Sequence, residues 1–445
     1  MSTEEIYARL QAECGGRLTT DTRTISGGEM FLALKGENFD GNKFALQALE
    51  AGARYAVVDG CDASDERLLH VPDAFRTLQE LARYHRRLLA REDGTIVLGL
   101  TGTNGKTTTK ELIRTVLASG LSVSATEGNL NNDIGVPLTL LRIPRGTQIA
   151  VVEMGANHPD DIAHLCAVVE PDYGLITNVG RAHLLGFGSY EGVQRAKGQL
   201  YDSVSGRLVN GDPVPGGKAV FVNTDDPVLK AMAAQHEGLS IIPYGPEYQG
   251  AKLLPPTAAE PFLRFRLGRR IIRTKLVGSY NITNVLAAIA VGKYFGIGIA
   301  QAAEAIASYT PSNNRSMMVR SGSNTLIVDA YNANPSSMKA ALDNFSLMEA
   351  PFRVALLGDM RELGEDSLSE HSALVRRLAD APFRAILVGE EFRKALDSCG
   401  VSLPWFSSSE ELAAELSANP IRDSVVLIKG SRGIKMETCI PALKA

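Results

Sequence analysis

One short segment limits what this chain can fold into more than any other. Residues 102–108 form a glycine-rich turn that follows the apolar run 96–100 and leads into a helical pattern from about Thr107. A strand that passes through glycines into a helix offers curled backbone N–H groups and a helix N-terminus to a phosphate group. The segment therefore predicts a parallel α/β sheet with a phosphate loop at one edge.

The loop also supplies side chains that nucleotide chemistry needs. Lys106 would reach the β- and γ-phosphates of ATP, and the Thr107 hydroxyl would bind Mg²⁺. The spacing departs from the usual G-x-x-x-x-G-K-T, because Leu100 stands where the first glycine is common. The alternative interpretation is a glycine-rich turn without a ligand. The predicted nucleotide-binding residues of the loop are Gly102, Thr103, Asn104, Gly105, Lys106, Thr107 and Thr108.

Two further polar side chains follow predicted strands. Glu153 ends the apolar run 149–152, and His183 follows a strand that ends near Val179. The carboxyl ends of parallel strands meet at the edge where ligands bind, so both residues are candidate metal ligands. The alternatives are a strand-end charge that faces water and a surface or packed histidine. Lys197 lies in a helical pattern, and its spacing alone gives it no role.

Composition excludes several classes of protein. The formal net charge of −4 gives no basic field for a nucleic acid partner. The five cysteines are far apart and lack C-x-x-C spacing, which indicates a reducing compartment rather than a disulfide framework or a zinc site. No apolar run approaches the ~20 residues that cross a bilayer. The N-terminal residues contain no signal-peptide core. We therefore expect a soluble cytoplasmic protein with no membrane span.

Alternating strand and helix patterns predict an α/β fold with three domains. Residues 1–92 read as a smaller N-terminal α/β domain, and residues 93–311 as a central domain whose parallel sheet carries the phosphate loop. Within the central domain, residues 262–277 predict two antiparallel strands that turn near Gly268. Residues 312–445 predict a doubly wound, Rossmann-like sheet, although no G-x-G-x-x-G turn is present.

Motifs along nearly the whole chain resemble those of the Mur ligases, the enzymes of peptidoglycan synthesis. They occur in the family's order. They are Asp21-Thr22-Arg23, the phosphate loop, 131–137 (Asn-Asn-Asp-Ile-Gly-Val-Pro), 153–156 (Glu-Met-Gly-Ala), 182–184 (Ala-His-Leu), 196–198 (Ala-Lys-Gly), 329–335 (Asp-Ala-Tyr-Asn-Ala-Asn-Pro), 358–364 (Gly-Asp-Met-Arg-Glu-Leu-Gly) and 429–432 (Lys-Gly-Ser-Arg).

The resemblance implies roles that the residues alone do not give. Lys197 would be carbamylated by CO₂, a reaction that turns a cation into an anionic metal ligand. Two Mg²⁺ ions are expected, held by Thr107, Glu153, His183 and Lys197. The implied catalytic residues are Lys106, His183, Lys197 and Arg315. Outside the loop, ATP would be contacted at the adenine by Asn281 and Asn284, at the phosphates by Arg315 and at the ribose by Asp329. The implied substrate-binding residues are Asp21, Thr22, Arg23, Asn131, Asn132, Tyr331, Asn332, Asn334, Lys429 and Ser431.

The same resemblance implies an ATP-dependent amide ligase. A carboxylate of a UDP-muramoyl-tripeptide would be phosphorylated, and the amine of D-alanyl-D-alanine would attack the acyl phosphate. The N-terminal domain would bind the UDP moiety. The C-terminal domain would bring the amine and close over ATP, in an enzyme expected to be a monomer. The alternatives are another amino-acid ligase of the family, a phosphate-loop NTPase that acts on a macromolecule, and a non-catalytic binding module.

The sequence departs from the family's pattern in two places. Leu185 stands where glutamate is common, shortly after Arg181. Tyr280 stands where a histidine often precedes the asparagine that opens the helix. These differences concern the surroundings of the second metal ion and of the adenine, and they leave the phosphate loop intact.

Overall fold

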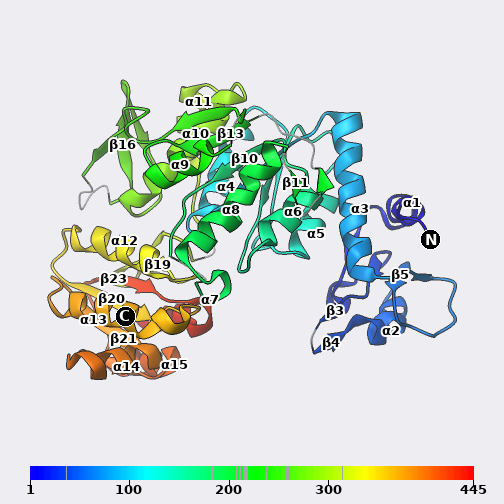
Figure 1. The fold of residues 1–445 in the computed structure, drawn as a ribbon. Coiled ribbons are helices and arrows are strands. Elements are labelled where there is room, and N and C mark those ends of the chain that lie inside the picture. Colours follow the sequence, from blue (N-terminus) through cyan, green and yellow to red (C-terminus); the bar gives the residue numbers. More distant parts are fainter. Residues whose placement is uncertain are drawn as a thin grey trace.

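Three sheets form the framework of the molecule (Figure 1). The computed structural model describes residues 1–36, 38–181, 184–206, 208–209, 212–213, 219–236, 238–255, 261–312 and 314–444. His183, a predicted metal ligand, lies outside the described residues. Within the described ranges, none of the helices combines the length and hydropathy that a bilayer crossing demands.

The N-terminal unit is a small parallel sheet with the strand order β1-β2-β5-β6. An antiparallel hairpin of β3 and β4 lies beside it. The elements are α1 (Thr3–Cys14), β1 (Leu18–Thr19), β2 (Met30–Leu32), β3 (Lys35–Gly36), β4 (Phe39–Asp40), α2 (Ala45–Glu50), β5 (Tyr55–Val58), β6 (Leu68–His70) and α3 (Ala74–Leu88).

The central unit is built on a parallel sheet with the order β14-β13-β10-β7-β9-β8. Its strands are β7 (Ile96–Thr101), β8 (Val123–Ala125), β9 (Ile149–Glu153), β10 (Tyr173–Ile176), β13 (Ala219–Asn223) and β14 (Ile241–Tyr244). Its helices are α4 (Lys106–Leu117), α5 (Gly135–Leu141), α6 (Asp161–Val169), α7 (Leu184–Phe187), α8 (Tyr190–Val204), α9 (Pro227–Ala234), α10 (Ile282–Tyr294) and α11 (Ile299–Ser308). Two smaller antiparallel sheets complete it, formed by β11 (Leu208–Val209) and β12 (Asp212–Pro213), and by β15 (Lys252–Leu254), β16 (Arg264–Leu267) and β17 (Arg270–Arg273).

The C-terminal unit is a six-stranded sheet with the order β18-β19-β23-β20-β21-β22. Only its edge strand β18 runs antiparallel to its neighbour. The strands are β18 (Met317–Ser321), β19 (Asn324–Asp329), β20 (Arg353–Gly358), β21 (Arg384–Val388), β22 (Trp405–Phe406) and β23 (Val425–Lys429). The helices are α12 (Pro335–Ser346), α13 (Ser367–Ala379), α14 (Glu390–Cys399) and α15 (Ser409–Ala418).

The predicted α/β class and doubly wound C-terminal sheet are therefore confirmed. The predicted turn near Gly268 joins β16 to β17, and Gly268 has a φ of 58°, in the left-handed region that glycine adopts without strain. The sequence analysis did not predict the shorter strands, which are β1, β3, β4, β6, β8, β11, β12, β14, β15, β18 and β22.

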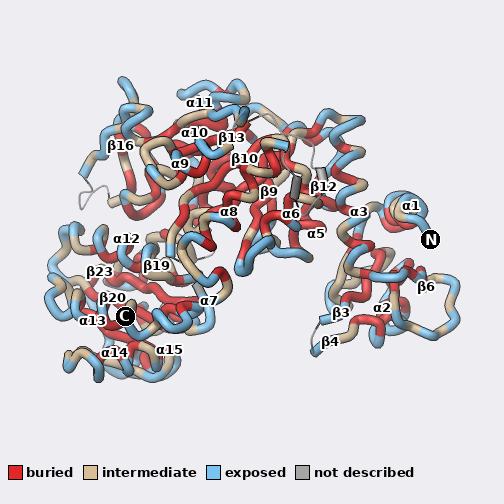
Figure 2. The backbone as a smooth tube through the Cα atoms, in the orientation of Figure 1, coloured by how far each residue is buried: buried red, intermediate tan, exposed pale blue. Residues whose placement is uncertain are grey.

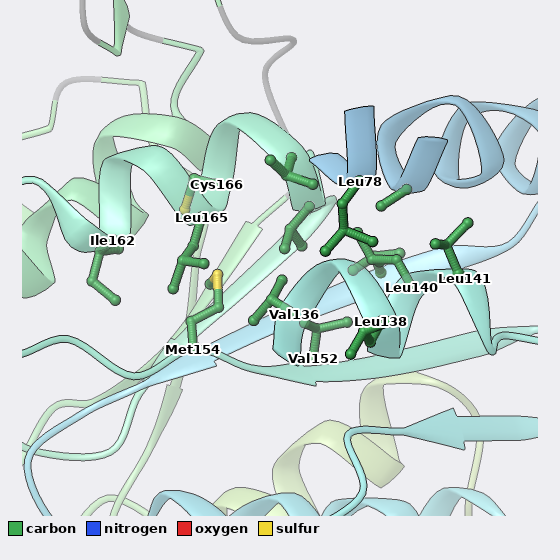
Figure 3. Packing of buried hydrophobic residues seen from close by; sticks show 14 of the residues in the cluster. Leu78, Val136, Leu138, Leu140, Leu141, Val152, Met154, Ile162, Leu165 and Cys166 are labelled. Atoms are coloured by element: carbon green, nitrogen blue, oxygen red, sulfur yellow. The ribbon is translucent and has the colours of Figure 1, made fainter. Parts of the chain in front are cut away.

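One hydrophobic core runs from the N-terminal unit into the central unit (Figure 2). Ile6 and Leu10 of α1 belong to the same cluster as Val152 and Met154 at the end of β9. Figure 3 shows Leu78 of α3 close to the α5 side chains that cover this face of the sheet. Helix α3 is therefore shared between the two units, which fixes the N-terminal sheet against the central one.

Three arginines of α3 strengthen this attachment. Arg83 and Arg87 both pair with Glu170, at 2.9 and 2.5 Å, just beyond the end of α6. Arg86 is 4% exposed and donates to the carbonyl oxygens of Val169 and Glu170 and to Asp172 Oδ2, at 3.1, 2.9 and 2.8 Å. A buried guanidinium with this many acceptors acts as a connector between the units.

Replacement of Arg86 with methionine is expected to lower the free energy of unfolding by about 3 kcal/mol, because it leaves buried acceptors without a donor. Arg91→Met is the matched control, since the Arg91 side chain is 72% exposed and pairs only at the surface with Glu92. Urea denaturation followed by circular dichroism measures both variants. Equal midpoints for Arg86→Met and Arg91→Met would contradict the connector role.

Candidate active site

A cavity of about 1080 Å³ lies where the three units meet. The central unit contributes the phosphate loop, Asn131, Asn132 and Glu153 to its walls. The N-terminal unit contributes residues of α3, and the C-terminal unit contributes residues that follow β19 together with Lys429 at the end of β23. The carboxyl ends of β7, β9 and β19 thus converge on one space, as expected for ligand sites in parallel sheets.

The phosphate loop opens α4 without a side-chain cap. Gly105 stands at the N-cap position with a φ of 76°, so the first-turn N–H groups of the helix carry no side-chain acceptor. The preceding part of the loop is held by Asn178, which follows β10. Thr103 N donates to Asn178 O and Asn104 N donates to Asn178 Oδ1, both at 3.0 Å. The result is a fixed loop followed by a free helix N-terminus, which suits an anionic phosphate group.

Lys106 lies across the loop. Its Nζ donates to the carbonyl oxygens of Gly102 and Thr103, at 2.8 and 3.2 Å. Desolvation lowers the pKa of Lys106 from its ordinary value, the charge of Glu153 raises it, and the charge of Arg315 lowers it further. The charges of Lys106, Arg315 and Glu153 therefore influence one another within the cavity.

Glu153 is 1% exposed and is held by two donors at Oε1. Thr107 Oγ1 donates to it at 3.1 Å and Asn131 Nδ2 at 2.9 Å. Its second oxygen, Oε2, is buried and accepts no hydrogen bond from the described residues. A buried carboxylate oxygen without a donor, next to a threonine hydroxyl, fits a hard divalent cation such as Mg²⁺, which takes oxygen ligands.

Lys197 is only 3% exposed and lies on α8, the helix that follows β10 and α7. Its Nζ is 5.9 Å from the centroid of the Phe187 ring. Desolvation lowers the pKa of Lys197 well below its ordinary value, Lys106 lowers it further, and Asp161 raises it. An amine in this environment loses its proton more readily than an exposed lysine does.

The C-terminal unit contacts the phosphate loop directly. Asn334 Nδ2 donates to Asn104 Oδ1 at 2.8 Å, and the reciprocal amide contact measures 3.5 Å. Nearby, Asp329 Oδ2 accepts from Lys429 Nζ at 2.6 Å, and Lys429 is 1% exposed. Lys429 also donates to the Asn332 carbonyl oxygen at 3.3 Å. Lys429 therefore joins Asp329 to the Asn332 backbone at the cavity wall, and Asn334 joins the same wall to the phosphate loop.

Asn281, which precedes α10 as its N-cap, and Asn284 within α10 lie behind the loop. Asn284 Nδ2 donates to Asn281 Oδ1 at 2.9 Å, and Asn281 Nδ2 donates to the Val277 carbonyl oxygen at 2.8 Å. The Tyr280 hydroxyl lies 3.2 Å from Ser316 Oγ, and burial raises the pKa of Tyr280. All four side chains line the cavity, so this wall joins α10 to the segment that leads into β18.

Most of the predicted site residues line this one cavity, and a few lie elsewhere. Asp21, Thr22 and Arg23 are outside its lining, with Arg23 paired to Asp21 at 2.7 Å on the surface of the N-terminal unit. Ser431 is 3% exposed, and its hydroxyl accepts from Arg361 N and donates to the Ala333 carbonyl oxygen. Gly102 and Lys197 are buried and are not among the residues that line the cavity.

The sequence analysis did not predict the part of the cavity wall that α3 and α6 form. The lining there includes Phe75, Arg76 and Arg83 of α3 and His164 of α6. Residues 74–90 showed only an amphipathic helix, because nothing in a helical pattern indicates which polar side chains face a neighbouring unit. Arg181 and Leu185, the unusual positions near His183, lie close to the C-terminal unit, with Arg181 3.9 Å from Glu370.

Gly102 has no room for a side chain. Its φ is 148°, and an added Cβ would lie 1.9 Å from Thr177 Oγ1 and 3.0 Å from Thr177 N. Gly102→Ala is therefore expected to displace the loop and lower kcat/KM for ATP by about 10²-fold, measured by steady-state kinetics. Gly146→Ala is the control, because Gly146 also has a positive φ, 77°, but open space around it. Unchanged ATP kinetics in Gly102→Ala would show that the loop does not hold nucleotide.

Family models match three stretches that together cover most of the chain. They are described as Mur ligase family, catalytic domain, at residues 17–90, Mur ligase middle domain at residues 100–292, and Mur ligase, glutamate ligase domain, at residues 314–432. The cavity is lined by residues from all three matched stretches.

Curated relatives and solved structures agree with these matches. The UDP-N-acetylmuramoyl-tripeptide–D-alanyl-D-alanine ligase of Bacillus subtilis is 32% identical, with 96% of this chain and 92% of the relative covered. The same ligase of Escherichia coli is also 32% identical, covering 96% and 93%. A crystal structure of MurF from Acinetobacter baumannii superposes with a TM-score of 0.83 at 32% identity, covering 96% of this chain and 93% of that one. MurF from Thermotoga maritima in complex with ADP superposes with a TM-score of 0.80 at 26% identity, covering 96% and 97%. The chain thus belongs to the Mur ligase family.

Proposed function

We propose that this chain joins D-alanyl-D-alanine to a UDP-N-acetylmuramoyl-tripeptide, with conversion of ATP to ADP and phosphate, in peptidoglycan precursor synthesis. The observation that carries the proposal is the convergence of the phosphate loop, the buried Glu153 and Arg315 on one cavity that all three units line. Curated relatives that bear this ligase name align with 96% of the chain, which supports the choice of substrates.

The first chemical step is transfer of the γ-phosphoryl group of ATP to the terminal carboxylate of the tripeptide. A carboxylate is a poor electrophile, and phosphorylation gives it a good leaving group. Negative charge spreads over the phosphoryl oxygens during transfer. Lys106 and Arg315, which both line the cavity, stabilise that charge, and the first-turn N–H groups of α4 stabilise the phosphates along the helix dipole.

Thr107 and Glu153 hold Mg²⁺ in this proposal, together with His183, whose role remains a prediction from sequence. When bound, the metal neutralises phosphate charge and fixes the phosphates for in-line transfer. Asn131 orients Glu153 through Oε1, so that Oε2 is the oxygen left for the metal.

In this proposal Lys197 is carbamylated and would be a further anionic metal ligand, in a site that would hold two Mg²⁺ ions. Only the neutral amine attacks CO₂: the nitrogen lone pair forms the N–C bond and a proton leaves. The lowered pKa of Lys197 favours that neutral form. The product carries a negative charge, which the nearby Lys106 stabilises in place of the cation–cation repulsion that precedes it.

In the second step the amine of D-alanyl-D-alanine attacks the acyl carbonyl carbon, and phosphate leaves. The acyl phosphate is open to hydrolysis, so the cavity must exclude water. The amide pair Asn104–Asn334 holds the C-terminal unit on the phosphate loop and serves this closure. Asn131, Asn132, Tyr331, Asn332 and Lys429 bind substrate at the same wall, Asn281 and Asn284 contact the adenine, and Asp329 contacts the ribose.

The three units divide this work at boundaries near residues 92 and 311. The N-terminal unit binds the UDP moiety through Asp21, Thr22 and Arg23, at a distance from the reacting groups. Ser431 supports the substrate wall through its contact with Ala333. In this proposal the chain acts as a monomer in the cytoplasm, the compartment that supplies ATP.

The test is ADP release by the purified chain against a panel of UDP-linked peptides and dipeptides. We expect release only when UDP-muramoyl-tripeptide and D-alanyl-D-alanine are both present. Release with a single amino acid in place of the dipeptide would indicate another ligase of the family. Release that depends on a macromolecule, and not on the tripeptide, would overturn the proposal.

A further inference from the structure

Arg315 is held in the cavity by an aromatic ring rather than by a carboxylate. Its guanidinium carbon lies 3.6 Å from the centroid of the Tyr331 ring, which is van der Waals contact with the ring face. Within the described part of the chain, Arg315 forms no ion pair, and its buried Nε has no hydrogen-bond partner. Both residues line the cavity, Arg315 just before β18 and Tyr331 just after β19.

A second arginine approaches the same ring from the end of β23. The guanidinium carbon of Arg432 lies 5.7 Å from the Tyr331 centroid, and its Nη1 pairs with Glu437 Oε1 at 2.8 Å. Arg432 therefore has a carboxylate partner, whereas Arg315 has none among the residues that the structure describes. The Tyr331 ring thus lies near two arginines: Arg432, whose charge is paired with Glu437, and Arg315, whose charge is not paired among the described residues.

Support by an aromatic ring, rather than by a carboxylate, leaves the charge and the N–H donors of Arg315 free. A carboxylate would fix the guanidinium but would accept its N–H groups and cancel its charge. The face of a tyrosine contacts the guanidinium plane and leaves the N–H groups at the edge free to donate. The charge of Arg315 also remains available, as its effect on the pKa of Lys106 shows.

We infer that Tyr331 is a positioning residue, whose ring keeps Arg315 in the cavity with its donors unpaired and ready for an oxygen of the triphosphate. The inference rests on the proposed function for the identity of that anion. The Tyr331 ring, and not the Tyr331 hydroxyl, would be the group that positions Arg315.

The test compares Tyr331→Leu with Tyr331→Phe. Loss of the ring face is expected to weaken binding of a nonhydrolysable ATP analogue with Mg²⁺ by roughly tenfold, measured by isothermal titration calorimetry. Tyr331→Phe keeps the face and is expected to restore most of that loss. The temperature of unfolding, measured in parallel, identifies any loss that comes from misfolding.

A double-mutant cycle separates positioning from general packing. In an Arg315→Ala background, Tyr331→Leu should weaken analogue binding no further, because the group that it positions is gone. Equal losses in both backgrounds, or a Tyr331→Phe variant as weak as Tyr331→Leu, would overturn the inference. The binding readout needs no ligase turnover, so a wild-type chain that binds the analogue but forms no product would refute the proposed function alone.

Discussion

Lys106→Ala is expected to lower kcat for ADP release by at least about 10³-fold, the largest effect of any single substitution in the loop. Lys106 is the cation whose Nζ lies on the loop carbonyl groups, and Glu153 and Arg315 are its electrostatic neighbours. Its removal takes away a positive charge at the place where the phosphoryl oxygens gain negative charge. The α4 N–H groups remain, so binding of ADP should weaken less than kcat falls.

Lys293→Ala provides the control for this substitution, since Lys293 is an exposed lysine at the end of α10 in the same unit. Steady-state kinetics with both substrates measure the fall in kcat, and ADP titration measures the loss of ADP affinity. Normal turnover by Lys106→Ala would mean that the loop at 102–108 is not the nucleotide site.

Local sequence patterns predicted the parts of this site that lie along one stretch of chain. The loop is one such part, because a strand, glycines, a lysine and a helix follow each other within residues 96–117. Glu153 is another, because it ends the buried strand β9 and therefore had to lie at the same sheet edge. In both cases, the hydrophobic pattern predicted the strand, and the end of the strand predicted where the side chain lies.

The parts that could not be predicted depend on how distant segments meet. The Asn104–Asn334 contact joins residues that are 230 positions apart, and the Arg315–Tyr331 stack joins two different strand ends. No periodicity encodes either contact, because the first follows from the placement of the C-terminal unit against the phosphate loop and the second from the antiparallel pairing of β18 with β19. The strands β1 and β22 have two residues each, too few to show the alternation that identifies a strand.

Lys197→Ala is expected to lower kcat by about 10²-fold or more, and short carboxylates such as acetate or formate should restore part of the loss. The substitution removes the amine that forms the carbamate and leaves space that a small anion fills, since Lys197 is 3% exposed. Lys230→Ala, at an exposed position of α9, is the matched control and should show neither loss nor rescue.

The acid–base properties of Lys197 add a second, independent expectation. Its pKa is lowered in the folded protein, so the neutral amine that reacts with CO₂ is present at a lower pH than for an ordinary lysine. Activity should therefore fall as pH drops through that lowered pKa, and it should fall at constant pH when CO₂ is removed from the buffer. Incorporation of isotopically labelled bicarbonate, followed by NMR spectroscopy, reports the carbamate directly. Wild-type rates for Lys197→Ala without added carboxylate, or a rate unaffected by removal of CO₂, would show that the reaction does not need a carbamate at Lys197.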